Sequence, residues 1–275
     1  MSSTIENAFI TTWRNEVVHK FSRSGSLLRD TVTVYPGVTG KTIKVHRVGS
    51  VQATVGRPRH APIPAADVPH DDIDITMLDI YARDYIDSLD MLKTNGEFRK
   101  NYTKELMDAV NRQIDQFIIN SLNQASTTEL SISNKLDSAG LITAGKALTN
   151  ANVGHGNRMA AISPGGEEDL LTDTKFTSRD FVRNSWLEKG FGDNVLGFRL
   201  TTIAPSPEGG LPVPAGSQRR NFFYDKRAVA LAIGAEPTLT AKFLDQEDAW
   251  MIQVKASVGS ALVLPEGVFR ASIAD

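Results

Sequence analysis

The stretch that decides the fold runs from Thr94 to Asn123, TNGEFRKNYTKELMDAVNRQIDQFIINSLN. Its first four residues have the form of a capping box, in which Thr94 caps a helix and Glu97 reaches back to the cap. Large apolar residues then recur every three or four positions, on one face of a helix: Phe98, Tyr102, Leu106, Val110, Ile114, Phe117, Ile118 and Leu122. The pattern predicts a helix over residues 96–123, about 40 Å long. That is roughly twice the usual helix length, which suits a structural spine across a flat molecule.

Upstream of this helix, apolar and polar residues alternate in two runs, Thr31–Tyr35 and Lys41–Val48, with Pro36-Gly37 after the first. Alternation around a Pro-Gly turn is typical of a β-hairpin. A third alternating run, Asp72–Met77, predicts another strand.

Between the second and third runs lie residues 49–69, which are rich in glycine and proline and include the basic group Arg57-Pro58-Arg59-His60. A long excursion without helical period is uncommon inside a compact domain and is typical of a functional loop or arm. A two-stranded ribbon is marginal alone in water. We therefore expect residues 29–78 to form an extended loop that lies on another surface, either its own core or a partner subunit.

The N-terminal residues 7–28 carry Phe9, Trp13, Val17 and Phe21 at a spacing of four, on one helical face. They are consistent with a short docked helix or with an arm that packs on a neighbouring subunit.

The second half of the chain has a mixed α and β pattern. Residues 125–157 are small and polar, with too little bulk for much core, and Ser163-Pro164 is a good helix start. Strands are predicted at 158–163, 195–203, 222–224, 250–258 and 268–273, a loop at 205–216, and a short helix at 225–233.

The composition excludes several classes of protein. The net charge is −2, so the basic excess of a protein that mainly grips nucleic acid is missing, and there is no cysteine for a disulfide or thiolate metal site. No stretch approaches the roughly 20 apolar residues of a membrane span, and the N-terminus lacks the pattern of a secretory signal. We expect a soluble protein made in a reducing cytoplasm.

Two glycine-containing stretches match the phosphate-binding loop motif in part. Residues 140–147 have the Gly-x4-Gly-Lys spacing, but Ala147 replaces the required Ser or Thr. Residues 37–42 end in Gly-Lys-Thr, yet Tyr35 stands at the first glycine position and a strand follows. We therefore predict no catalytic, cofactor or metal site and no enzyme, with a nucleotide-dependent enzyme left as a minor alternative. His70-Asp71-Asp72, with His60 nearby, favours a charged surface patch over a zinc site.

Four short sequence motifs in the second half of the chain, taken in their order, resemble those of a known family. They are Ser163-Pro164 before Asp169-Leu170-Leu171, KGFGDNVLGF at 189–198, FYDKRAV at 223–229 and GSALVLPEGV at 259–268. Together with the arm, the extended loop and the spine helix, they resemble the α+β Hong Kong 97-type fold of tailed-phage major capsid proteins.

The resemblance implies a division of the chain. It implies an N-terminal arm at 1–28, an extended β-hairpin loop at 29–78, a peripheral domain at 79–157 with spine helix 96–123, a mainly axial domain at 158–252, and C-terminal strands at 253–275 that return to the peripheral domain. It also implies a major capsid protein that forms pentamers and hexamers of an icosahedral phage head around double-stranded DNA, without sequence-specific binding. The resemblance further implies that the protein assembles in the host cytoplasm and is located in the virion.

The expected partners are further copies of the chain, a portal protein and a decoration protein. Because Met1 lies almost at the arm, we also expect either a separate scaffolding protein or none. No lysine, asparagine and glutamate match the crosslinking trio of some members. The candidate intersubunit contacts are Phe9, Trp13, Arg57, Arg59, His60, Asp71 and Asp72. An encapsulin-like compartment shell, which shares the fold, is the alternative function.

Overall fold

The computed structural model describes residues 23–63, 65–87, 98–127, 129–132, 134–177, 194–214 and 216–274. Its α-helices are α2 (Phe98–Asn123), α3 (Ser138–Asn150), α4 (Pro164–Thr172) and α5 (Thr174–Thr177), with short 3-10 turns at Arg29–Thr31, His155–Asn157 and Pro265–Gly267. Its strands are β1 (Thr33–Pro36), β2 (Thr42–Val48), β3 (His70–Thr76), β4 (Leu78–Asp87), β5 (Arg158–Ile162), β6 (Asn194–Val195), β7 (Phe198–Thr202), β8 (Gln218–Asp225), β9 (Val229–Leu244), β10 (Ala249–Leu262) and β11 (Val268–Ala274).

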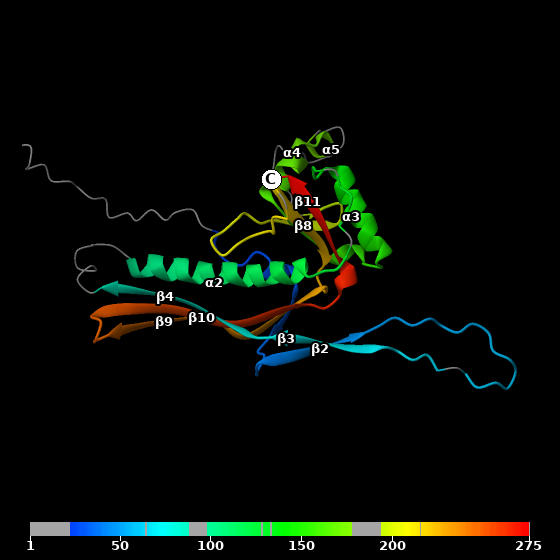
Figure 1. Ribbon diagram of the computed structural model, residues 1–275, viewed down its shortest axis with the longest axis horizontal. Coiled ribbons are helices and arrows are strands. Elements are labelled where there is room, and N and C mark those ends of the chain that lie inside the picture. The colour runs from blue at the N-terminus through cyan, green and yellow to red at the C-terminus, as the bar shows by residue number, and fades with distance from the viewer. Residues whose placement is uncertain are drawn as a thin grey trace, which may run out of the picture.

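A flat layer is built from α2 and a four-stranded sheet with the order β1-β9-β10-β4 (Figure 1). The helix lies along the sheet, and Val110 and Ile114 share a buried cluster with Ile80 of β4 and Val254 of β10. The predicted long helix is confirmed, although its two capping residues lie outside the described ranges. Burial of one helix face against a sheet is the reason for its 3.6-residue apolar period.

A second block stands on one end of this layer, built from a five-stranded sheet, β11-β8-β5-β7-β6, and helices α3, α4 and α5 (Figure 1). It has its own buried cluster, in which Phe198 and Phe223 meet edge to face at 5.7 Å. The predicted start of α4 is confirmed, because the Ser163 hydroxyl accepts a hydrogen bond from the Gly166 amide at 3.2 Å and Pro164 is the first helical residue.

The third part is a projecting ribbon, in which β2 and β3 pair antiparallel and residues 49–69 extend far beyond the layer (Figure 1). At the base of the ribbon, Ile75 is buried with Ala230 and Ala232 of β9, and Ile43 packs against them. The base of the ribbon therefore lies on the chain's own core, while the loop beyond it does not.

The predicted hairpin between residues 31–35 and 41–48 is wrong. β1 pairs in parallel with β9, and β2 pairs with β3. Gly37 and Gly40 have positive φ of 70° and 105°, and they turn the chain from one sheet to the next instead of closing a hairpin. Alternation identifies a strand but does not identify its partner.

The predicted short helix at 225–233 is also wrong, because residues 229–233 begin β9 and all five are buried. A short apolar run looks the same in a buried helix and a buried strand, and here β1 and β10 flank it on both sides.

The low bulk expected of residues 125–157 did not prevent core formation. Within α3, Leu141, Ala144 and Leu148 are fully buried, and they share a buried cluster with Phe198 of β7. The N-terminal segment of residues 7–28 falls outside the described residues up to position 22, and residues 23–28 are not helical.

The two closing strands are confirmed but belong to different sheets. β10 is central in the four-stranded sheet, and β11 pairs with β8 in the five-stranded sheet. The chain therefore passes between the two sheets at 226–228 and again at 263–267. The division into peripheral and axial domains stays a prediction.

Candidate assembly surfaces

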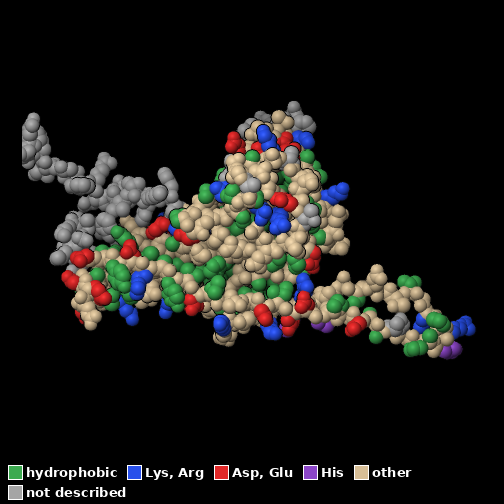
Figure 2. All heavy atoms as spheres, viewed as in Figure 1, with side chains coloured by type: hydrophobic (Ala, Val, Ile, Leu, Met, Phe, Trp, Pro, Cys, Tyr) green, Lys and Arg blue, Asp and Glu red, His purple; other side chains and the backbone are tan. Residues whose placement is uncertain are grey.

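The loop beyond the ribbon presents a cationic surface with exposed apolar side chains. Arg57, Arg59 and His60 are exposed at its tip, and the sequence from Gly49 to Ala66 contains no carboxylate. The Arg57 guanidinium donates to the Ala61 carbonyl at 2.9 Å, and exposed valines and Ile63 occur along the loop, with Val55 95% exposed. Figure 2 shows the basic side chains at the far end of this projection. Exposed apolar side chains beside such basic residues are typical of an interaction surface.

Two other predicted contact residues lie at the base of that loop and have partners within the chain. Asp71 accepts from the Arg47 guanidinium at 2.7 Å, and Asp72 lies 2.5 Å from the His46 ring. Both are cross-strand pairs in the β2–β3 register. Exposed pairs of this kind contribute only about 0–1 kcal/mol to stability. Because each pair joins residues directly opposite one another, the two pairs favour this register of the ribbon. Phe9 and Trp13 lie outside the described residues.

The opposite end of the flat layer is acidic. The turn between β9 and β10 contains Asp245, Glu247 and Asp248, all exposed, and Asp87 of β4 lies opposite Ala249 at the same end. Figure 2 shows acidic side chains gathered there. Sequence reasoning missed this cluster, although four polar residues in a row between two alternating runs were its signal. The subunit thus carries opposite charges at the two ends of its long axis.

The sheet face that points away from α2 carries tyrosines and cations. Because alternate residues of a strand point to opposite faces and Ile80 and Ile86 are buried, Tyr81, Arg83 and Tyr85 lie on the other face. Tyr81 is 63% exposed, and Arg83 lies 5.3 Å from the centre of the Tyr85 ring. This face is a second surface suited to a partner.

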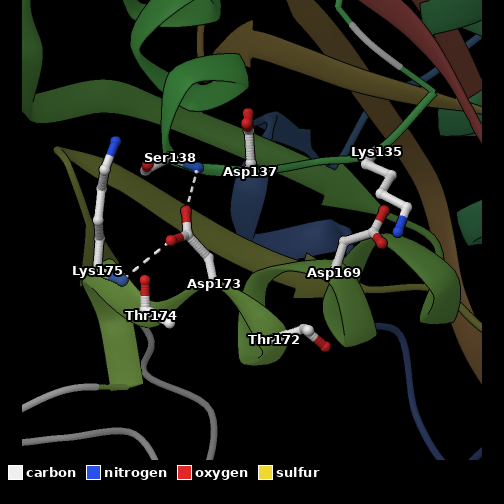
Figure 3. Close-up of a pocket in the computed structure, with 8 residues that line it drawn as sticks. All are labelled: Lys135, Asp137, Ser138, Asp169, Thr172, Asp173, Thr174 and Lys175. Carbon is white, nitrogen blue, oxygen red and sulfur yellow. Dashed lines mark hydrogen bonds between the residues drawn. The ribbon is translucent and has the colours of Figure 1, made fainter.

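A hollow of about 350 Å³ near the start of α3 is lined by three carboxylates (Figure 3). Asp137 accepts from the Gly140 amide, Asp169 from the Leu136 amide, and Asp173 from the Ser138 and Lys175 amides. Burial acts to raise the pKa of Asp173, but these backbone hydrogen bonds outweigh burial and lower its pKa. The carboxylates therefore hold helix ends and loops in place.

The two segments that resemble phosphate-binding loops in sequence, residues 140–147 and 37–42, do not have the strand–loop–helix structure that such a loop requires. Gly140 and Gly145 lie inside α3, and residues 37–41 lead into strand β2.

Across the described ranges, no group of three or more His, Asp or Glu residues could hold a metal ion. In the same part of the chain, no helix is both long and apolar enough to cross a membrane.

A last candidate surface is where the N-terminal segment meets α2. Asp115 is fully buried and accepts three hydrogen bonds, from the Ser26 hydroxyl at 2.6 Å and from the Leu27 and Leu28 amides at 3.1 Å each. It also forms an ion pair with the Arg23 guanidinium at 2.9 Å. Two turns earlier, Asp108 accepts from the Gly25 amide at 3.0 Å. These carboxylates hold residues 23–28 against α2. Sequence reasoning missed them, since their backbone partners give no pattern.

A helix-backed sheet, a projecting ribbon and a second α/β block define the Hong Kong 97-type fold of shell-forming subunits. The sequence agrees with the fold: the family model described as phage capsid protein matches residues 5–274, and the chain belongs to that family. No curated protein matches the sequence.

Solved phage capsids share the fold at low sequence identity. The capsid of cyanophage P-SCSP1u has a TM-score of 0.80 and 16% identity, over 100% of this chain and 96% of that chain. The structure of Mycobacterium phage Che8 has a TM-score of 0.78 and 20% identity, over 96% and 97%. The head of Helicobacter pylori bacteriophage KHP40 has a TM-score of 0.76 and 12% identity, over 98% and 96%. The predicted fold and family are confirmed, and neither the encapsulin-like shell nor the nucleotide-dependent enzyme is favoured.

Proposed function

We propose that this chain is the major capsid protein of a tailed phage, which self-assembles as hexamers and pentamers into an icosahedral head around double-stranded DNA. The observation that carries the proposal is the loop of residues 49–69, which projects from a phage-capsid fold without a core of its own. Its exposed apolar side chains are suited to burial on a neighbouring copy. The protein acts in the virion and assembles in the host cytoplasm.

The charges of the subunit indicate how two copies meet. The tip with Arg57, Arg59 and His60 is complementary to the acidic turn with Asp245 and Glu247 at the other end of the molecule. A head-to-tail contact between different surfaces closes into rings when its rotation allows. Exposed ion pairs are weak, so apolar burial supplies most of the affinity and the charges select the orientation.

Other partners follow from the same function. A portal protein, a decoration protein and a separate scaffolding protein remain predicted partners. The exposed face with Tyr81 and Tyr85 is available in the single subunit for one of them.

The first test is electron microscopy of the purified protein under assembly conditions, with closed shells as the expected result. In a variant, Asn-Gly replaces residues 50–68. The Gly49 amide donates to the Pro69 carbonyl at 2.8 Å, so a two-residue turn bridges the gap without moving β2 or β3. We expect this variant to unfold at the wild-type temperature and to form no shells. Normal shells from it would contradict the role of the loop.

The second test addresses orientation. Reversing the tip with Arg57→Glu and Arg59→Glu is expected to block assembly, and adding Asp245→Lys and Glu247→Lys in the same chain is expected to restore it. The control is Asp71→Lys with Arg47→Glu, which swaps a pair that is satisfied within the chain. If reversing both partners leaves assembly blocked, the loop tip does not meet the acidic turn.

A further inference from the structure

Arg112 of α2 is the point where three parts of the chain meet. Its side chain is only 3% exposed. Its Nε and Nη2 donate to the two carboxylate oxygens of Glu208 at 2.7 and 2.9 Å, and Nη2 also donates to Glu105 at 3.0 Å. Its Nη1 donates to the Arg23 carbonyl at 3.3 Å. A two-pronged guanidinium–carboxylate pair of this kind fixes orientation as well as charge.

Glu208 comes from a loop that is held against the helix. In this loop, which follows β7, Ser206 and Gly209 exchange backbone hydrogen bonds of 2.6 and 3.0 Å. Gly209 has a φ of 131°, and an added Cβ there would lie 2.6 Å from the Gln116 side chain. The loop therefore packs directly on α2, and Figure 1 shows it beside the helix. The second block thus brings Glu208 to a fixed position.

The carboxylates that hold the N-terminal segment are the helical neighbours of Arg112. Asp108 precedes it by four residues and Asp115 follows it by three, so all three side chains share one face of α2. Asp108 holds the Gly25 amide, and Asp115 holds the Leu27 and Leu28 amides. Without Glu208, the buried guanidinium of Arg112 would keep only Glu105, which is about half exposed, as a carboxylate partner. An underpaired buried guanidinium is costly, so Arg112 would then compete for Asp108 and Asp115.

We propose that Glu208 is a positioning residue for the N-terminal segment. By occupying the guanidinium of Arg112, it leaves Asp108 and Asp115 to the amides of residues 25–28. The order of residues 25–28 thus depends on a loop of the second block. This link concerns the single chain and does not depend on shell formation.

The experiment is amide hydrogen exchange, measured by mass spectrometry on the full chain before assembly. In Glu208→Gln we expect exchange at Gly25, Leu27 and Leu28 to become at least tenfold faster, with exchange in β5 unchanged. Glu208→Asp keeps the carboxylate and is expected to retain more protection than Glu208→Gln.

The matched control is Glu236→Gln. It removes a carboxylate from another arginine pair, with Arg29 at 2.5 Å, close to the same segment but apart from Arg112. We expect wild-type exchange at residues 25–28 in this control. The proposal is overturned if Glu208→Gln exchanges like the wild type, if exchange in β5 rises by the same factor, or if Glu236→Gln has the same effect.

Discussion

The crossing of β10 and the end of β3 at Gly259 allows a substitution with a predictable cost. A Cβ added at Gly259 would lie 2.5 Å from the Thr76 carbonyl oxygen, 2.9 Å from the Ile75 side chain and 3.1 Å from the Thr76 carbonyl carbon. Two of these three atoms belong to the backbone, so they cannot rotate away. In Gly259→Ala, β3 must therefore shift, and overpacking of this kind costs about 1–3 kcal/mol.

For a chain of this size, each kcal/mol lowers the unfolding temperature by about 2 °C. We therefore expect Gly259→Ala to unfold about 2–6 °C below the wild type in a thermal melt of unassembled subunits. Because β3 is one strand of the ribbon, its shift also displaces the loop tip. Shell formation, followed by light scattering, is expected to slow by more than the loss of stability explains.

The control, Gly145→Ala, makes the same substitution but is expected to raise the unfolding temperature. At Gly145, inside α3, the nearest atoms to an added Cβ are Arg158 Nη1 at 3.5 Å and Phe198 Cε2 at 3.7 Å, which are ordinary contacts. Alanine is favoured over glycine inside a helix by about 0.8–1.0 kcal/mol. Gly145→Ala should therefore melt about 2 °C above the wild type and assemble normally. A Gly259→Ala protein that melts at or above the wild-type temperature and assembles at the wild-type rate would refute the reasoning.

Three further predictions concern buried polar groups. Asp115→Asn replaces one carboxylate oxygen by a donor and loses two of its four polar contacts, at about 1.5–3 kcal/mol each. Urea unfolding should show a loss of about 3–6 kcal/mol, against less than about 1 kcal/mol for the exposed Asp74→Asn. Equal losses would contradict the anchor at Asp115. Tyr224→Phe removes the buried contact of the Tyr224 hydroxyl with Thr31 at 2.6 Å and should cost about 1 kcal/mol in the same assay; no loss would mean that the hydroxyl is not needed. The hydrogen bond from Arg112 holds the pKa of Glu208 below its ordinary value of 4.5. The stability that this group contributes is thus present above pH 4.5 and is lost as the pH falls through its lowered pKa. The difference in unfolding free energy between the wild type and Glu208→Gln should therefore narrow below about pH 4. A difference that stays constant with pH would contradict this prediction.

Much of the fold could be predicted because some patterns have only one physical solution. A sustained apolar period over 26 residues is compatible with a helix alone, and α2 was found at the expected place. The start of α4 could be predicted because serine and proline act locally. By contrast, the five apolar residues from Val229 to Ile233 suit either a helix or a strand, and only their two strand neighbours decide.

Partners of strands and charges could not be predicted, since they depend on distant residues. Thr33 pairs with Ala230, far along the chain. The loop tip with Arg57 and Arg59 could be proposed as a contact because glycine, proline and positive charge mark a projecting loop. The role of Asp115 could not, because two of its four partners are backbone amides, which have no signature in the sequence, and all four lie more than 80 residues away along the chain.

The ribbon and the flat layer are joined by almost continuous extended backbone. β3 and β4 are separated by Met77 alone, whose amide donates to the Lys41 carbonyl, so residues 70–87 run as one strand of about 60 Å. β4 then pairs with β10 over ten successive residues. Tension applied to the loop therefore reaches the sheet along the strand axis, at right angles to its hydrogen bonds. Those bonds bear the load together in shear instead of opening one after another, so a subunit pulled by its loop resists that tension with the whole length of the β4–β10 pairing.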